Sequence, residues 1–139
     1  MHTLISFDYG DKKIGLAVGN TLTQNTQELV TIRSGNAGPN WDELDLIIQE
    51  WKPDLLLVGL PLNMDGTESV ISAKAKSFGE QLARRYNLAI EFEDERLSSN
   101  EADSLIRAGL SEKQGLSRKK QLKRDQIAAR LILQSYLNR

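Results

Sequence analysis

Two short apolar runs near the start of the chain, residues 4–7 and 14–18, constrain its fold more than any other feature. A polar break that contains Gly10 separates them, and this pattern predicts a β-hairpin. The first run ends at Asp8, so a carboxylate stands where the backbone turns. Asp8 is therefore a candidate ligand-binding acid. The alternative is an ordinary surface acid, because Asp close to Gly is common in turns.

The next segments predict a third strand over residues 26–32, a loop over 33–40 and then a helix. Asn40 can cap this helix and Pro53 ends it. The apolar residues of the helix recur at helical spacing and predict one buried face. They are Trp41, Leu44, Ile47, Ile48 and Trp51.

A continuous apolar run over residues 55–58 follows that helix. Such a run predicts a strand that is buried on both faces, as in a parallel sheet covered by helices. A turn-rich loop over 59–67 leads into a helix over 68–86. Its predicted inward residues are Val70, Ala73, Phe78, Leu82 and Tyr86.

Residues 88–93 alternate between apolar and other side chains, which predicts an edge strand or a half-buried strand. Asp94 and Glu95 follow it directly. Ser98 with Glu101 forms a capping-box pattern and predicts a helix that stops near residue 109. After a loop, a last helix is predicted over 120–137.

Together these segments predict an α/β fold with a mixed five-stranded sheet. The first three strands are antiparallel, the later ones are parallel, and helices cover both faces. A length of 139 residues suits one core, so residues 1–139 are expected to form a single domain.

Composition restricts the chemistry that this chain can perform. It contains no cysteine, and its single histidine is His2. Thiolate metal sites, disulfides and Ser-His triads are therefore excluded or very unfavourable. Carboxylates, lysines and hydroxyls remain, and any metal would be a hard, oxygen-ligated ion such as Mg²⁺ or Mn²⁺. Neither a signal peptide nor a membrane-spanning stretch is indicated.

Acidic side chains are expected to gather at one edge of the sheet. Ligands in open α/β sheets bind beyond the carboxyl ends of the strands. Asp8 ends the first strand, and Asp94 and Glu95 follow the last. Asp125 falls on the inward stripe of the final helix, where an unpaired carboxylate is costly. A divalent ion would relieve the repulsion among these acids. The alternative for Asp125 is a core salt bridge.

The charge of the chain is unevenly distributed. From residue 105 onwards there are nine basic and two acidic residues, although the whole chain has a net charge of -1. This asymmetry suggests a phosphate-rich partner, and the alternative is a solvated helix face whose Lys and Arg residues serve solubility. Five basic residues directly precede Asp125 and are predicted to contact phosphates: Arg118, Lys119, Lys120, Lys123 and Arg124.

The chain resembles the YqgF/RuvX family, which is related to Holliday-junction resolvases, has a ribonuclease-H-like fold and is regarded as a group of candidate pre-16S ribosomal RNA nucleases. The resemblance covers essentially the whole chain. It rests on Asp8-Tyr9-Gly10 with residues 14–18, on residues 58–68, on Asp94-Glu95-Arg96-Leu97-Ser98, and on Asp125 with Ala128-Ala129 ahead of Ile132-Leu133.

This resemblance implies that Asp8, Glu95 and Asp125 hold Mg²⁺ or Mn²⁺ and cleave a phosphodiester. The expected substrate is structured RNA, most directly the 5′ end of precursor 16S ribosomal RNA, in the cytoplasm. A monomer or weak homodimer and no membrane partner are expected. Additional nucleic-acid contacts are expected from Lys12, Asn63 and Arg96, with a salt bridge to Asp94 or Asp8 as the alternative for Arg96.

The resemblance also shows a departure from the pattern of related resolvases and ribonucleases H. Those enzymes typically have four acids, one of them after the fourth strand, but here that strand leads into Gly59-Leu60-Pro61. A fourth ligand would come from Asp65, Glu68, Asp94 or water. Three alternatives to the RNA nuclease therefore remain: a Holliday-junction DNA resolvase, a non-catalytic RNA-binding or assembly module, and a nucleotide-binding domain.

Overall fold

The protein is described by a computed structural model that covers residues 3–35, 38–61, 65, 67, 69–94 and 118–138. For residues 118–125 it describes the backbone alone. The predicted helix over 98–109 and the loop after it lie outside the described residues.

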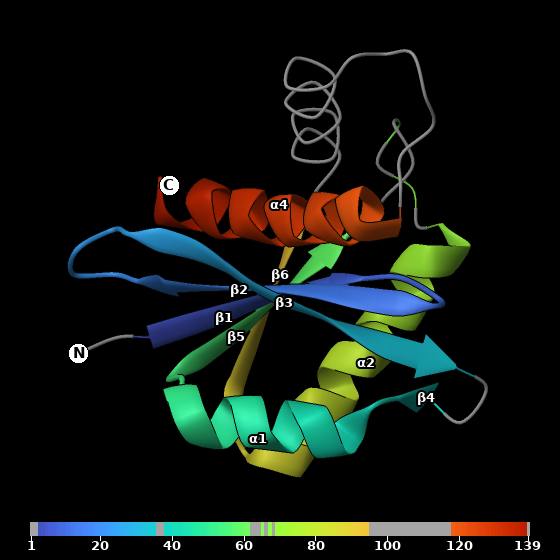
Figure 1. Cartoon of the computed structure of the whole chain (residues 1–139), viewed down its shortest axis with the longest axis horizontal. Coiled ribbons are helices and arrows are strands. Elements are labelled where there is room, and N and C mark those ends of the chain that lie inside the picture. Colours follow the sequence, from blue (N-terminus) through green and yellow to red (C-terminus); the bar gives the residue numbers. More distant parts are fainter. Residues whose placement is uncertain are drawn as a thin grey trace.

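A six-stranded sheet forms the centre of the fold, with the order β4-β3-β2-β1-β5-β6 (Figure 1). Strands β1 to β4 pair antiparallel, whereas β1, β5 and β6 pair parallel. The predicted mixed sheet is thereby confirmed. Its strands are β1 (Thr3–Tyr9), β2 (Lys13–Asn20), β3 (Thr26–Gly35), β4 (Gly38–Pro39), β5 (Leu55–Leu60) and β6 (Ala89–Asp94).

The sixth strand arises where the sequence predicted a loop. Strand β3 continues to Gly35, and the chain then returns through Gly38 to pair antiparallel as β4. Gly38 has a φ of 98°, a conformation that glycine adopts without the strain of a Cβ atom. The glycines that indicated a loop therefore make a short hairpin at the edge of the sheet.

Helices cover both faces of the sheet (Figure 1). Helices α1 (Trp41–Trp51) and α2 (Val70–Tyr86) lie on one face, and α4 (Arg118–Leu137) lies on the other. The predicted cap of α1 is confirmed, because the Asn40 side chain accepts a hydrogen bond from the backbone N–H of Glu43. None of the described helices is long and apolar enough to cross a membrane.

Two apolar clusters lie on the two faces of the sheet. The larger cluster joins the sheet to α1 and α2 and includes the predicted residues Leu44 and Ile47. The smaller cluster lies under α4 and joins Leu4, Ala17 and Leu57 to three helix residues. Those helix residues are Ala129, Ile132 and Leu133.

The predicted inward face of α2 is partly wrong. Val70 is 75% exposed and Ala73 is also exposed. A capping box between Ser69 and Ser72 starts the helix and turns Ser72, rather than Ala73, towards the sheet. Ala75, Phe78, Gly79 and Leu82 complete the buried face. At Gly79 a Cβ atom would lie 2.7 Å from the Phe92 ring, so this glycine allows β6 to approach α2 closely.

A cluster of polar and aromatic side chains ties α1 to α2. Arg85 donates to both carboxylate oxygens of Asp45, at 2.9 and 2.7 Å, and stacks over Trp41. The Tyr86 hydroxyl also donates to Asp45, at 2.6 Å. The hydrogen bonds from Arg85 and Tyr86 lower the pKa of Asp45 to about 2. Because the folded-state pKa is depressed, the ionised Asp45 stabilises the fold above pH 4.

We expect the stability contribution of Asp45 to fade as the pH falls from about 4 to about 2, where its carboxylate is protonated in the folded state. Chemical denaturation of the wild type and Asp45→Asn across this range measures the effect. The stability difference between them should narrow towards pH 2. In an Arg85→Ala background the pH dependence of the difference should shrink. A difference that is independent of pH in the Arg85-containing proteins contradicts the assignment.

Candidate functional site

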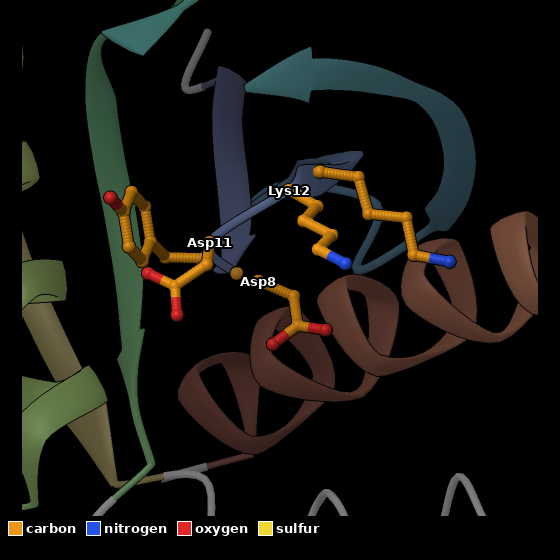
Figure 2. A pocket seen from close by; sticks show the side chains of 6 residues that line it. Asp8, Asp11 and Lys12 are labelled. Atoms are coloured by element: carbon orange, nitrogen blue, oxygen red, sulfur yellow. The ribbon is translucent and has the colours of Figure 1, made fainter. Parts of the chain in front are cut away.

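Asp8 lies near the carboxyl end of β1, on the face of the sheet that α4 covers. Side chains alternate along the strand, so Leu4, Ser6 and Asp8 share this face. Leu4 packs under α4, and the Ser6 hydroxyl donates to the backbone carbonyl of Ala129 at 2.5 Å. Figure 2 shows the half-buried Asp8 carboxylate directed towards α4. Asp8 is thus more than a solvated turn acid.

A pocket of about 360 Å³ opens at this end of β1 (Figure 2). The turn between β1 and β2 lines it, from Asp8 through Lys13. Asp11 and Lys12 are exposed, and of the two only Lys12 is predicted to contact nucleic acid. Asp11 accepts a hydrogen bond from Lys74 of α2 at 2.9 Å, and this contact raises the pKa of Lys74. The two acids of the turn therefore have different neighbours, α4 for Asp8 and α2 for Asp11.

Helix α4 is oriented on the sheet by polar contacts as well as by its small apolar cluster. Arg130 donates to Glu28 at 2.9 Å and to Thr26 at 3.0 Å. Gln126 donates to Thr31 at 3.2 Å, and Tyr136 donates to Glu91 of β6 at 2.8 Å. These contacts reach both sides of β1 and fix which face of α4 lies against the sheet.

This orientation determines the position of Asp125. Residue 125 lies in α4 one helical turn before Ala129, whose carbonyl oxygen accepts the hydrogen bond from Ser6. Residues four apart share a helix face. The backbone position of Asp125 therefore agrees with the predicted inward stripe. Its side chain lies outside the described part of the chain.

The other predicted site residues are described only in part. Asp94 lies at the carboxyl end of β6, at the same end of the sheet as Asp8, because β1 and β6 run parallel on either side of β5. Glu95, Arg96 and Asn63 lie outside the described residues. The five predicted basic residues occupy the first turns of α4, and their side chains are likewise not described: Arg118, Lys119, Lys120, Lys123 and Arg124. The meeting of Asp8, Glu95 and Asp125 stays a prediction.

The donor chemistry of this edge suits a hard cation. Asp8 offers carboxylate oxygens beside an open pocket, and the chain has no cysteine that would select a softer metal. Among the residues that the structure describes, no three histidine, cysteine or acidic side chains are grouped to hold a metal. A metal site with three such ligands would therefore need at least one side chain outside the described residues, and the predicted ones are Glu95 and Asp125.

Sequence reasoning missed one acid on this face. Glu93 was assigned to the polar side of an alternating edge strand, yet it is 7% exposed. Strand β6 is indeed at the sheet edge, but α4 covers the face on which Glu93 lies. A glutamate two residues before Glu95, at the carboxyl end of a parallel strand, was the signal that could have found it.

Comparisons with known proteins extend these observations. The family described as RuvX, Holliday junction resolvase, matches residues 2–139. A relative from Aeromonas hydrophila is 44% identical over 135 residues, which are 97% of this chain and 94% of the relative. A relative from Pseudomonas putida is 44% identical over 139 residues, covering 99% and 95%. Both relatives are named, provisionally, as pre-16S rRNA nucleases.

Solved structures share the fold at much lower identity. Fowlpox virus resolvase bound to Holliday junction DNA matches with a TM-score of 0.58 at 13% identity, over 98% of this chain and 97% of that chain. Thermus thermophilus RuvC with a Holliday junction substrate matches with a TM-score of 0.52 at 15% identity, over 95% and 92%. The expected ribonuclease-H-like fold is therefore confirmed.

We expect Ser6→Ala to loosen α4 from the sheet, because a buried hydrogen bond to Ala129 is lost. The free energy of unfolding should fall by about 1 kcal/mol. Amide hydrogen exchange should accelerate in α4 more than in α1. Ser77→Ala, at an exposed position on α2, is the matched control. Equal protection of α4 in both variants would show that the Ser6 bond does not hold the helix.

Proposed function

The chain belongs to the RuvX family, and from this membership and the geometry of its sheet edge we propose that it is a divalent-metal-dependent endonuclease. It hydrolyses phosphodiesters of structured nucleic acid. The observation that carries the proposal is the position of Asp8, at the carboxyl end of β1, directed towards α4 and beside an open pocket. In open α/β sheets this edge is where ligands bind.

The proposed cation ligands are Asp8, Glu95 and Asp125, with Mg²⁺ or Mn²⁺ as the ion. When bound, the ion would neutralise charge on the phosphate. It would also lower the pKa of a water bound to it, so that hydroxide is available at neutral pH. The residues of the chain do the remaining work. Asp8 orients the phosphate that is cut, at the carboxyl end of β1. Helix α4 excludes solvent from one side of the Asp8 carboxylate. Lys12, exposed in the same turn, is available to a phosphate oxygen.

The substrate follows from the relatives rather than from the site alone. Since two relatives at 44% identity are named as pre-16S rRNA nucleases, we propose precursor 16S ribosomal RNA, cut near its 5′ end. Branched DNA is the second substrate to test, because the solved structures that share the fold include resolvases with Holliday junctions. Residues 1–139 act as one domain, in the cytoplasm, as a monomer or weak homodimer.

Nucleic-acid contacts are proposed on either side of the sheet edge. Lys12 lies in the β1–β2 turn, and Asn63 and Arg96 follow β5 and β6 in sequence. The first turns of α4 carry the basic segment that precedes Asp125. These residues are proposed to hold the phosphate backbone and carry no base specificity.

We expect Asp8→Asn to reduce Mn²⁺-dependent cleavage of a precursor 16S RNA fragment by more than about a hundredfold. The reason is that loss of an outer-shell partner alone costs about 10- to 100-fold, and Asp8 is a proposed direct ligand. Gel analysis of end-labelled RNA measures the cut. Asp11→Asn is the matched control, because Asp11 lies in the same turn but contacts Lys74.

The same assay, repeated with a four-way DNA junction and accompanied by a measurement of RNA binding, separates the alternative functions. Cleavage of RNA that depends on Asp8 supports the proposal. Cleavage of a four-way DNA junction without cleavage of RNA assigns the chain as a resolvase. Binding of RNA without any metal-dependent cut, or a cut that survives Asp8→Asn, rejects the catalytic assignment.

Neutralising Lys119 and Lys120 together should weaken RNA binding to all sequences alike and reduce the slope of log K against log salt by about one to two. Filter binding at several salt concentrations measures this slope. Lys76→Ala with Arg84→Ala, on α2 across the sheet, removes the same charge and should leave the slope unchanged. A loss confined to one RNA sequence would instead indicate base recognition.

A further inference from the structure

One row of residues crosses three neighbouring strands at the proposed site. Glu93 of β6 pairs with Gly59 of β5. Phe7 of β1 pairs with Val58 of β5, so the next residues along these parallel strands, Asp8 and Gly59, are neighbours. Asp8 and Glu93 therefore lie on either side of Gly59. Their backbones are two strand spacings apart, about 10 Å.

Both carboxylates lie on the face that α4 covers. Leu57 belongs to the apolar cluster under α4, and strand alternation places Gly59 on the same face. Glu91 accepts a hydrogen bond from Tyr136 of α4, so Glu93, two residues further, lies on that face as well. Asp8 is directed towards α4 (Figure 2).

The β5 residue between these two acids is a glycine. Gly59 is buried and has no side chain, so no side chain of β5 separates Asp8 from Glu93 in this row. A bulkier residue at this position would separate the two carboxylates. Glycine in a buried strand weakens it and often marks a place where a ligand approaches closely.

The burial of Glu93 adds a second, independent constraint. Its side chain is 7% exposed, whereas Asp94 beside it is exposed. Placing a carboxylate in such surroundings is expensive unless it serves a cation or a polar network. Glu91, on the same face, has its interaction with Tyr136 away from the sheet edge. Glu93 is the member of this pair that lies in the row of Asp8.

We propose that Glu93 is an additional carboxylate ligand of the candidate metal site and binds the same ion as Asp8, across Gly59. The inference rests on the proposed function, because it names one more residue of the same site. It differs from the prediction that a fourth ligand comes from Asp65, Glu68, Asp94 or water. The added oxygen ligand would come from inside the sheet rather than from the segment that follows β6.

Calorimetric titration with Mn²⁺ alone, in the absence of nucleic acid, tests the inference without relying on activity. Glu93→Gln should weaken Mn²⁺ binding about tenfold or more, by analogy with the loss of groups that hold a metal. Glu91→Gln is the matched control, because it makes the same change on the same strand and face, and it should bind Mn²⁺ as the wild type does. In the Asp8→Asn background the effect of Glu93→Gln should shrink, because both residues act on one ion.

Thermal unfolding without metal separates a ligand from a structural acid. The unfolding temperatures of the wild type and Glu93→Gln are therefore measured both without metal and with Mn²⁺. Added Mn²⁺ should then raise the unfolding temperature of the wild type more than that of Glu93→Gln. A lower metal-free unfolding temperature of Glu93→Gln with unchanged Mn²⁺ affinity would assign Glu93 to the core and overturn the inference.

Two further outcomes also decide the role of Glu93. Glu93→Gln that binds Mn²⁺ like the wild type, while Asp8→Asn does not, overturns the role of Glu93 and leaves the proposed function standing. A wild type that binds no Mn²⁺ overturns the proposed metal dependence, and the ligand role of Glu93 with it.

Discussion

The rest of the structure depends on the packing of α4 across β1, because this contact determines where the proposed site residues lie relative to the sheet. A narrow apolar cluster and the bond from Ser6 to Ala129 hold the helix against the parallel side of the sheet. Contacts from Arg130 hold it against the antiparallel side. Small side chains such as Ala17 and Ala129 let the helix approach the strands closely. Gln126 bonds to Thr31, which lies in the same row as Asp8 across the sheet, so the backbone of residue 125 lies at the end of the sheet where Asp8 lies.

The overall plan of the fold could be predicted from the sequence because its signals were local. The hairpin at residues 4–18, the buried run at 55–58 and the cap at Asn40 each follow from short-range patterns, and all three are confirmed. The prediction failed where long-range packing decides. Val70 and Ala73 match the helical period, but packing against the sheet buries Ser72, Ala75 and Phe78 instead. The return of the chain at Gly38 also depends on a partner strand, which a loop pattern does not show.

How much of the candidate site the sequence predicts differs from residue to residue. Asp8 was identified because a strand, an acid and a glycine follow one another, and the structure directs its side chain towards α4. The position of residue 125 follows from helical periodicity. The burial of Glu93 could not be read from alternation, because alternation distinguishes the two faces of a strand and does not reveal that a helix covers the second. Which side chain lies beside Gly59 depends on the register between neighbouring strands. The pattern within one strand does not give that register.

The bond between Ser6 and Ala129 joins positions 123 residues apart, and this separation has a consequence for when the protein can act. During synthesis the hairpin that carries Asp8 emerges early, yet the helix that covers its carboxylate is made after β5, α2 and β6. Closing so long a loop costs chain entropy, and the contact cannot form before residue 129 has been synthesised. A nascent chain would therefore carry Asp8 without the helix that covers it, and the proposed site could be completed only after α4 has been made.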